Sequence, residues 1–196
     1  MRTGKVIRET TETAVDLTIN LDGKGVSDID TGIGFFDHML KLFAKHGGID
    51  LVIGCNGDIE VDGHHSVEDI GIALGEAVKQ ALGDKRGIKR YGTFFLPMDE
   101  SLVMVSMDIS GRAFLVYDGG GAMAPMIGDY DTELTEEFLR AFAFNAVITL
   151  HVKVLYGTNS HHKVEGIFKA LGRALRAAVD IDSARADEIP STKGML

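Results

Sequence analysis

The chain carries the same potential metal-binding motif twice, a His-His pair and a Glu with two residues between them. On a helix, side chains four positions apart share a face, so the first histidine and the glutamate of one motif can reach the same ion. The second histidine is rotated by about 100° and cannot easily reach that ion. Each helix can therefore serve two metal sites. The two motifs are His64-His65-Ser66-Val67-Glu68 and His161-His162-Lys163-Val164-Glu165.

Two such helices that face each other can complete both sites. We expect each site to combine the first histidine and the glutamate of one motif with the second histidine of the other motif. His38 and Glu137 can supply further ligands, because the internal repeat described below makes them counterparts. Whether the helices meet within one chain or between two chains stays open. The expected sets are His64, Glu68, His162 and Glu137 for one site, and His161, Glu165, His65 and His38 for the other.

Imidazole and carboxylate ligands suit a divalent ion of borderline hardness, and manganese, iron and zinc all meet this description. A single His-His pair on a helix is more often a surface feature than a ligand set, but two copies with Glu at the same spacing favour metal binding. Three other residues have simpler interpretations. We expect His46 to end a helix before two glycines, His151 to pack or hydrogen-bond on a strand, and Cys55 to be a small buried side chain.

The residues after each motif predict the helices that position it. Apolar side chains recur at the i, i+3, i+4 spacing of an amphipathic helix, with the same register in both copies. The similarity continues upstream, where residues 36–44 align with residues 135–143 and place His38 opposite Glu137. The apolar positions are Ile70, Ala73, Leu74, Ala77, Val78 and Ala81 in the first copy, and Ile167, Ala170, Leu171, Ala174, Leu175 and Ala178 in the second.

Each half of the chain is therefore predicted to contain a strand pair, a helix, a further strand and the motif helix. Alternating polar and apolar residues at 12–23 and 100–111 predict half-buried strands in the two pairs. The further strands are expected at 49–55 and 148–155. The predicted fold is an internally duplicated α+β unit, with two similar halves that each have a small sheet and two helices on one face.

Turn-forming and charged residues around Gly87 mark the expected boundary between the halves. The first half would then cover residues 1–87 and the second half residues 88–183, with a C-terminal tail at 184–196 that is too short and polar to fold alone. The glycine-rich segment 118–128 is expected to be a mobile loop. A lid over a site is one interpretation of this loop. The simpler interpretation is that the fold tolerates an inserted segment at this position.

The composition limits the classes of function. With 196 residues and 45% hydrophobic residues, the chain can bury a substantial core. Its formal charge of -9 argues against broad electrostatic binding to nucleic acid or anionic lipid, so any bound anion must meet a local cluster of cations. The first residues show no apolar core of a signal peptide, and no stretch predicts a membrane span. We therefore expect a cytoplasmic protein with no nucleic-acid or membrane partner.

Six segments spread along almost the whole chain form a highly specific combination: Arg8–Glu12, Phe36–Leu40, Asp62–Asp69, Ser110–Arg112, Asn159–Glu165 and Ile189–Gly194. With these segments the chain resembles the imidazoleglycerol-phosphate dehydratase family. The resemblance implies a duplicated α+β fold, like that of the second domain of ribosomal protein S5. It also implies two manganese ions per subunit at subunit boundaries, and self-association into a 24-mer shell.

The resemblance assigns roles to individual residues as well. Two positions depart from the family: Glu137 stands where the family often has His, although a carboxylate can also coordinate, and Leu42 stands where some relatives have a polar residue near the substrate. The implied metal ligands are His38, His64, His65, Glu68, His161, His162 and Glu165. The implied phosphate-binding residues, which include two from the C-terminal tail, are Arg90, Arg112, Lys169, Ser191 and Lys193.

The reaction implied by the resemblance is the dehydration of D-erythro-imidazole glycerol phosphate to imidazole acetol phosphate in L-histidine biosynthesis. It removes a weakly acidic carbon-bound proton and a neighbouring hydroxyl, so it needs an electron sink. Metal ions on the substrate imidazole would provide one by stabilising the imidazolate. The resemblance points to Glu12 as the base, with Glu100 and Asp99 as secondary candidates. Glu68 and Glu165 are also expected to be catalytic residues.

Two other functions are compatible with the motifs. The first is a metal-dependent hydrolase or isomerase of another small phosphate ester, in which the metal activates water. The second is a non-catalytic role, in which metal ions join subunits or are stored. The second alternative predicts no role for the cationic residues that the resemblance assigns to phosphate.

Overall fold

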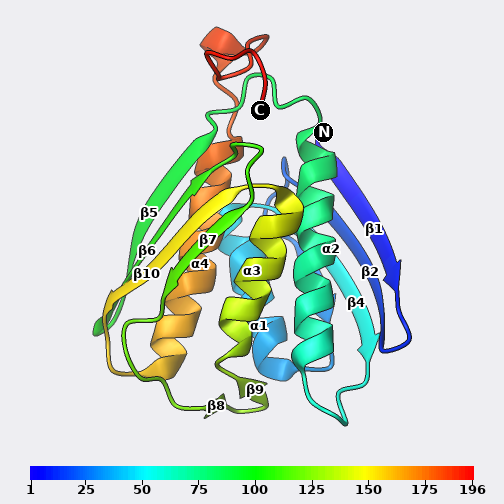
Figure 1. The fold of residues 1–196 in the computed structure, drawn as a ribbon, viewed down its shortest axis with the longest axis vertical. Helices are drawn as coiled ribbons and strands as arrows, with labels where there is room; N and C mark the ends of the chain where they lie inside the picture. The colour runs from blue at the N-terminus through cyan, green and yellow to red at the C-terminus, as the bar shows by residue number, and fades with distance from the viewer.

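The computed structural model describes residues 1–196 and contains two four-stranded sheets with four α-helices between them (Figure 1). The first half of the chain forms one sheet and two helices: β1 (Thr3–Glu9), β2 (Thr13–Asn20), β3 (Ser27–Asp30), α1 (Gly34–Gly47), β4 (Asp50–Gly57) and α2 (His64–Leu82). The second half forms the other sheet, a short hairpin and two helices: β5 (Tyr91–Met98), β6 (Ser101–Asp108), β7 (Phe114–Asp118), β8 (Met126–Ile127), β9 (Tyr130–Asp131), α3 (Leu134–Ala146), β10 (Thr149–Tyr156) and α4 (Ser160–Val179).

The two sheets share one topology, which confirms the predicted duplication. Their strand orders are β1-β2-β4-β3 and β5-β6-β10-β7, and in each sheet only the last pair is parallel. The strands predicted at 49–55 and 148–155 are β4 and β10. The sequence pattern misses the edge strands β3 and β7, because Ile29 is the only buried side chain of β3 and β7 has none. Short strands with so few buried residues give no clear alternation.

The helices of one half pack against the helices of the other half. Helix α2 lies on β1 and β2 and contacts α3, while α4 lies on β5 and β6 and contacts α1. A single hydrophobic cluster of 49 buried residues runs through all of these contacts. The two halves are therefore repeats in sequence and topology, but they are built around one shared core.

Repeat-related glycines allow the helices to approach closely. A Cβ at Gly75 of α2 would lie 2.7 Å from the carbonyl oxygen of Phe142 of α3, and a Cβ at Gly172 of α4 would lie 2.4 Å from that of Phe43 of α1. Both distances are too short for a carbon atom. The two crossings use equivalent positions, so an approximate two-fold relates the halves.

The glycine-rich segment 118–128, which the sequence predicts to be a mobile loop, makes long-range hydrogen bonds to α4. The Lys163 Nζ donates to the carbonyl oxygens of Gly120 (3.1 Å) and Ala122 (3.3 Å). Downstream, the turn between β8 and β9 contacts the start of α1, where the Asp129 carboxylate accepts from the Gly34 N–H at 2.6 Å. The sequence of the segment alone shows none of these partners.

The C-terminal tail follows α4 and folds back over the boundary between the halves (Figure 1). The N–H of Gly87 donates to the carbonyl of Glu188 at 2.8 Å, and the Arg86 Nη1 donates to the carbonyl of Asp187 at 2.6 Å. The tail is thus stabilised by the domain that it covers. None of the helices combines the length and apolar character that crossing a membrane requires.

Candidate functional site

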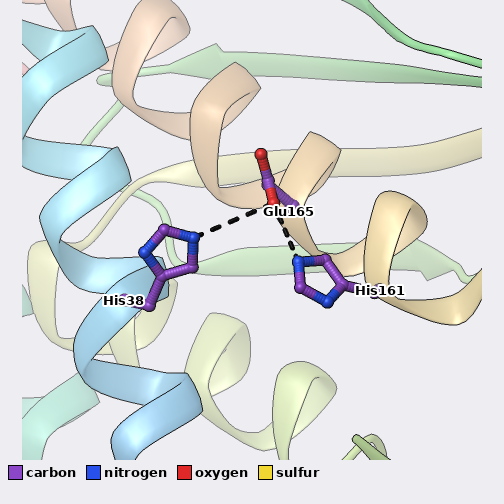
Figure 2. Close-up of side chains that lie close together, drawn as sticks. All are labelled: His38, His161 and Glu165. Carbon is purple, nitrogen blue, oxygen red and sulfur yellow. Dashed lines mark hydrogen bonds and ion pairs between the residues drawn. The ribbon is translucent and has the colours of Figure 1, made fainter.

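One group of potential metal ligands is already gathered within the single chain, at the start of α4 (Figure 2). The Nε2 of His161 lies 3.0 Å from Glu165 Oε2, and the Nε2 of His38 lies 4.0 Å from the same oxygen. Ligand atoms of these three residues lie within 4.8 Å of one another. Two imidazole nitrogens and one carboxylate oxygen are a donor set that fits a divalent ion of borderline hardness.

The local sequence explains how α4 begins at this group. The side chain of Asn159 caps the helix by accepting from the N–H groups of His161 (2.9 Å) and His162 (3.3 Å). Because His161 and Glu165 are four positions apart, they project from one face of the helix. Helix α1 brings His38 to this face through its packing on α4. The ring of Phe35 packs edge-on against His161, with centroids 5.1 Å apart.

The glutamate of this group has a second partner, Lys169, whose Nζ lies 2.5 Å from Glu165 Oε1. Burial raises the pKa of Glu165, but the hydrogen bonds and charges of Lys169 and His161 outweigh it and leave the pKa below its ordinary value. The carboxylate is therefore ionised at neutral pH. Lys169 occupies one of its oxygens, and the other oxygen points toward the imidazoles.

The repeat-related residues of the first half are arranged more openly. His64 and Glu137 line one cavity of about 420 Å³ beneath the β8–β9 hairpin. The Glu137 carboxylate lies 3.9 Å from the Arg140 Nε, and it does not form a compact group of three ligands with His64 and Glu68. His64 and Glu137 therefore line a common cavity, but the three residues do not form a compact ligand group in one chain.

The second histidine of each motif lies on the other side of its helix, beside two carboxylates. The pKa of both imidazoles is raised, mainly by the hydrogen bonds that His65 donates to Asp58 and His162 donates to Glu100. Because α2 packs on α3 and α4 packs on α1, neither of these histidines joins the glutamate of the other motif within one chain. The ligand sets expected from the sequence are therefore not assembled within one chain.

The candidate base Glu12 is exposed and lies next to one of these histidines, with its Oε2 3.7 Å from His65 Nε2. Asp99 has the same relationship to the other motif, at 3.7 Å from His162 Nε2. The sequence repeat pairs Glu12 with Glu100. In the structure, however, the residue that lies beside the Nε2 of the second motif histidine, as Glu12 does in the first half, is Asp99. Sequence reasoning also missed the role of Asp58 as a partner of His65. In the sequence, Asp58 is only one acidic residue in the loop before the motif, and nothing there indicates its contact.

Four of the five candidate phosphate-binding residues gather at the opposite end of the molecule. Arg90 and Arg112 both contact the Asp108 carboxylate, at 2.7 and 3.8 Å. Arg90 and Ser191 line a cavity of about 590 Å³, and the Lys193 N–H donates to the Ser191 Oγ at 3.2 Å. Lys169, the fifth candidate, lies beside Glu165 instead.

These two regions are far apart in one chain. The N–H of Arg90 donates to the carbonyl of Ala178 near the end of α4, whereas Glu165 lies in the second turn of that helix. At 1.5 Å per residue, the two helix positions are separated by about 20 Å. A small phosphate ester cannot span this distance, so a common site would need at least two chains.

The residues given simpler interpretations take no part in the group of His38, His161 and Glu165. His46 is in the last turn of α1, and His151 is exposed on β10. Cys55 and Leu42 are partly buried against the core, and burial raises the pKa of the Cys55 thiol.

Comparison with known proteins identifies close relatives. The family model described as imidazoleglycerol-phosphate dehydratase matches residues 31–175. The chain is 62% identical to an imidazoleglycerol-phosphate dehydratase of Clostridium novyi, over 96% of the chain and 95% of that protein. It is 59% identical to the one of Clostridium acetobutylicum, over 100% and 98%. The crystal structure of imidazoleglycerol-phosphate dehydratase from Staphylococcus aureus superposes with a TM-score of 0.83 at 40% identity, over 92% of this chain and 99% of that one.

Proposed function

The chain belongs to the imidazoleglycerol-phosphate dehydratase family, and from this premise we propose that it dehydrates D-erythro-imidazole glycerol phosphate to imidazole acetol phosphate in L-histidine biosynthesis. The observation that carries the proposal is the group of His38, His161 and Glu165, because its imidazole and carboxylate donors fit the divalent ion that the proposed reaction would use. The enzyme would act in the cytoplasm.

The proposed cofactors are two divalent ions per subunit, with manganese as the expected metal. One site would use the gathered group and the second motif histidine of a neighbouring subunit. The other would use its repeat counterparts, with the carboxylate of Glu137 as a ligand. The proposed sets are His38, His161 and Glu165 with His65 of a second copy, and His64, Glu68 and Glu137 with His162 of a second copy.

Dehydration removes a hydroxyl from one carbon and a proton from the adjoining carbon, and the resulting enol becomes the ketone. When bound to the ring nitrogens, the metal ions would supply stabilisation of the imidazolate form of the substrate. Glu12 would take the carbon-bound proton, since its exposed carboxylate lies beside His65. Asp99, which has the equivalent place beside His162, would serve as the second proton carrier.

The cationic cluster would orient the substrate through its phosphate. Arg90 presents a guanidinium fixed by Asp108 and by the carbonyl of Pro190, so little side-chain freedom is lost on binding. Arg112 is exposed and lies beside the same Asp108 carboxylate, so it could also contact the phosphate. Ser191 and Lys193 would add hydrogen bonds from the tail, and Lys169 would contribute from a different chain.

The proposed site requires self-association, and we propose the 24-mer shell of the family resemblance as its form. Support comes from the distance between the two regions along α4. A second support is the outer face of the β5-β6-β10-β7 sheet, where Tyr91, Phe95 and Phe114 expose 58%, 56% and 58% of their surface. Large exposed aromatic side chains are enriched at subunit interfaces.

The test combines an activity assay with metal analysis. The purified protein should form the ketone from imidazole glycerol phosphate, lose this activity after chelation, and regain it with Mn²⁺. Metal analysis of the same sample should give two ions per chain on a very large particle. Turnover that survives complete metal removal would contradict the metal-dependent proposal.

A further inference from the structure

The imidazoles of His65 and His162 are each held between two carboxylates, and the two contacts differ in length. On His162, Nδ1 lies 2.7 Å from Glu100 Oε2, whereas Nε2 lies 3.7 Å from Asp99. On His65, Nδ1 lies 3.0 Å from Asp58 Oδ2, whereas Nε2 lies 3.7 Å from Glu12. In both cases the hydrogen bond is made by Nδ1, and Nε2 is left without one.

The hydrogen bond at Nδ1 determines which ring nitrogen can bind a metal. An ionised carboxylate can only accept, so Nδ1 must carry the proton. In the neutral ring Nε2 then has a free lone pair, which is the state that metal coordination requires. Histidines that bind metals usually donate their other N–H to a carboxylate or carbonyl in this way.

Glu100 is fixed by several other contacts. Its Oε1 accepts from the backbone N–H groups of Thr158 (3.1 Å) and Asn159 (2.8 Å) and from the Ser101 hydroxyl (2.9 Å). These bonds connect the β5–β6 turn to the start of α4. Oε2 is therefore directed at His162, and the pKa of Glu100 is lowered by that hydrogen bond and by the backbone N–H groups.

The two halves obtain the same arrangement from different parts of the chain. Glu100 lies in the turn between paired strands, whereas Asp58 lies in the loop between β4 and α2. The Asp58 N–H donates to the carbonyl of Glu12 at 3.2 Å, which holds this loop beside the β1–β2 turn. Glu12, the sequence counterpart of Glu100, is thereby left free of the Nδ1 contact.

We propose that Glu100 and Asp58 are positioning residues for metal binding, which hold His162 and His65 with Nε2 turned outward toward an ion shared with a neighbouring subunit. The inference rests on the proposed metal sites. It goes beyond them because it assigns the orientation of these two ligands to two residues outside the ligand sets.

The test is a double-mutant cycle on Mn²⁺ affinity, measured by electron paramagnetic resonance of free Mn²⁺ during titration of the assembled protein. The Glu100→Gln variant keeps a carbonyl oxygen for the backbone N–H groups, but its amide can donate to Nδ1 and so favour the tautomer with a proton on Nε2. It should weaken one of the two sites about 10- to 100-fold and leave the other unchanged. Glu76→Gln, an exposed change on α2, is the control and should alter neither site.

The cycle separates positioning from general stability. In a His162→Ala background, Glu100→Gln should cause no further loss, because Glu100 acts only through that imidazole. Asp58→Asn, with His65→Ala, provides the same test in the first half if Glu100→Gln folds poorly. Full Mn²⁺ affinity in Glu100→Gln or Asp58→Asn, or additive losses in the cycle, would overturn the inference. If His162→Ala itself retains both ions, the proposed metal sites fail instead.

Discussion

Lys169 and Glu165 form an ion pair within one turn of α4, with the Lys169 Nζ 2.5 Å from Glu165 Oε1 and only 9% of the glutamate side chain exposed. The two oxygens of the Glu165 carboxylate therefore have different partners. One oxygen neutralises a lysine, and the other faces His161 and His38. The lysine thus has a structural role in the isolated chain in addition to the proposed role in phosphate binding.

Replacing Lys169 by Met should destabilise the metal-free protein more than the metal-loaded protein. Without metal, the variant leaves a nearly buried carboxylate with one partner fewer, at a cost of about 1–3 kcal/mol. A bound ion would compensate part of this charge. Urea unfolding with and without Mn²⁺ measures the difference, and an equal loss in both states would contradict the expectation. Lys153→Met, at an exposed ion pair on β10, is the matched control.

Glu12→Gln should remove turnover while leaving the metal sites intact. Loss of a general base typically lowers the rate by about 10²- to 10⁴-fold, and the residue contacts His65 only at 3.7 Å. Turnover at saturating substrate and metal content should be measured on the same sample. Glu9→Gln, an exposed change at the end of β1, should keep normal turnover. A fully active Glu12→Gln protein with both ions bound would exclude Glu12 as the base.

Arg112→Gln should weaken substrate binding without affecting the fold, because 69% of the side chain is exposed and its only ion pair is a long one to Asp108. Hydrogen bonds to a charged group contribute about 1.5–3 kcal/mol, so kcat/KM should fall about 10- to 100-fold. Steady-state kinetics would show this chiefly as a higher KM. Lys5→Gln, which removes an exposed ion pair to Asp16, should leave KM unchanged.

The pH dependence of stability should have opposite signs in the metal-free and metal-loaded protein. The hydrogen bonds that Glu100 and Asp58 accept raise the pKa of His162 and His65 above 6.5. In the metal-free protein these protonated rings stabilise the fold below pH 6.5, and this contribution is lost as pH rises through the folded pKa. A bound ion needs the neutral rings, so metal-loaded protein should gain stability over the same rise. Thermal unfolding between pH 6 and 8 with and without Mn²⁺ tests both signs, and parallel curves would refute the expectation.

Gly172→Ala should lower stability although alanine favours helices. Its Cβ would lie 2.4 Å from the carbonyl of Phe43, and such overpacking costs about 1–3 kcal/mol, more than the gain of about 1 kcal/mol in helix propensity. Urea unfolding should show a reduced midpoint. Gly54→Ala has no atom within 4 Å of its Cβ and should be nearly neutral.

The sequence predicted the duplicated fold because its strongest pattern is local. The two motif helices show the same apolar register, and β4 and β10 lie where alternation and spacing place them. The edge strands escaped prediction because they bury at most Ile29. The contact of the segment after β7 with Lys163 was not predictable, because its two partners lie far apart in sequence.

The candidate site was predictable only in part. His161 and Glu165 follow from helix geometry, and His38 follows from the repeat. The separation of the two motif helices within one chain does not follow from the sequence, because it depends on which helices pack together. The contacts of Asp58 with His65 and of Lys169 with Glu165 could not be predicted, because the sequence does not show which partner a single acidic or basic residue will have.

The crossed helix packing has a consequence for the origin of the chain. A polypeptide with only one half would leave the side of α2 that now meets α3 uncovered, and two identical copies could cover each other through the same glycine contacts. The present molecule is then equivalent to a tethered homodimer. Fusion makes that association independent of protein concentration. It also frees the two copies to diverge, and the different sources of Asp58 and Glu100 are a visible result of that freedom.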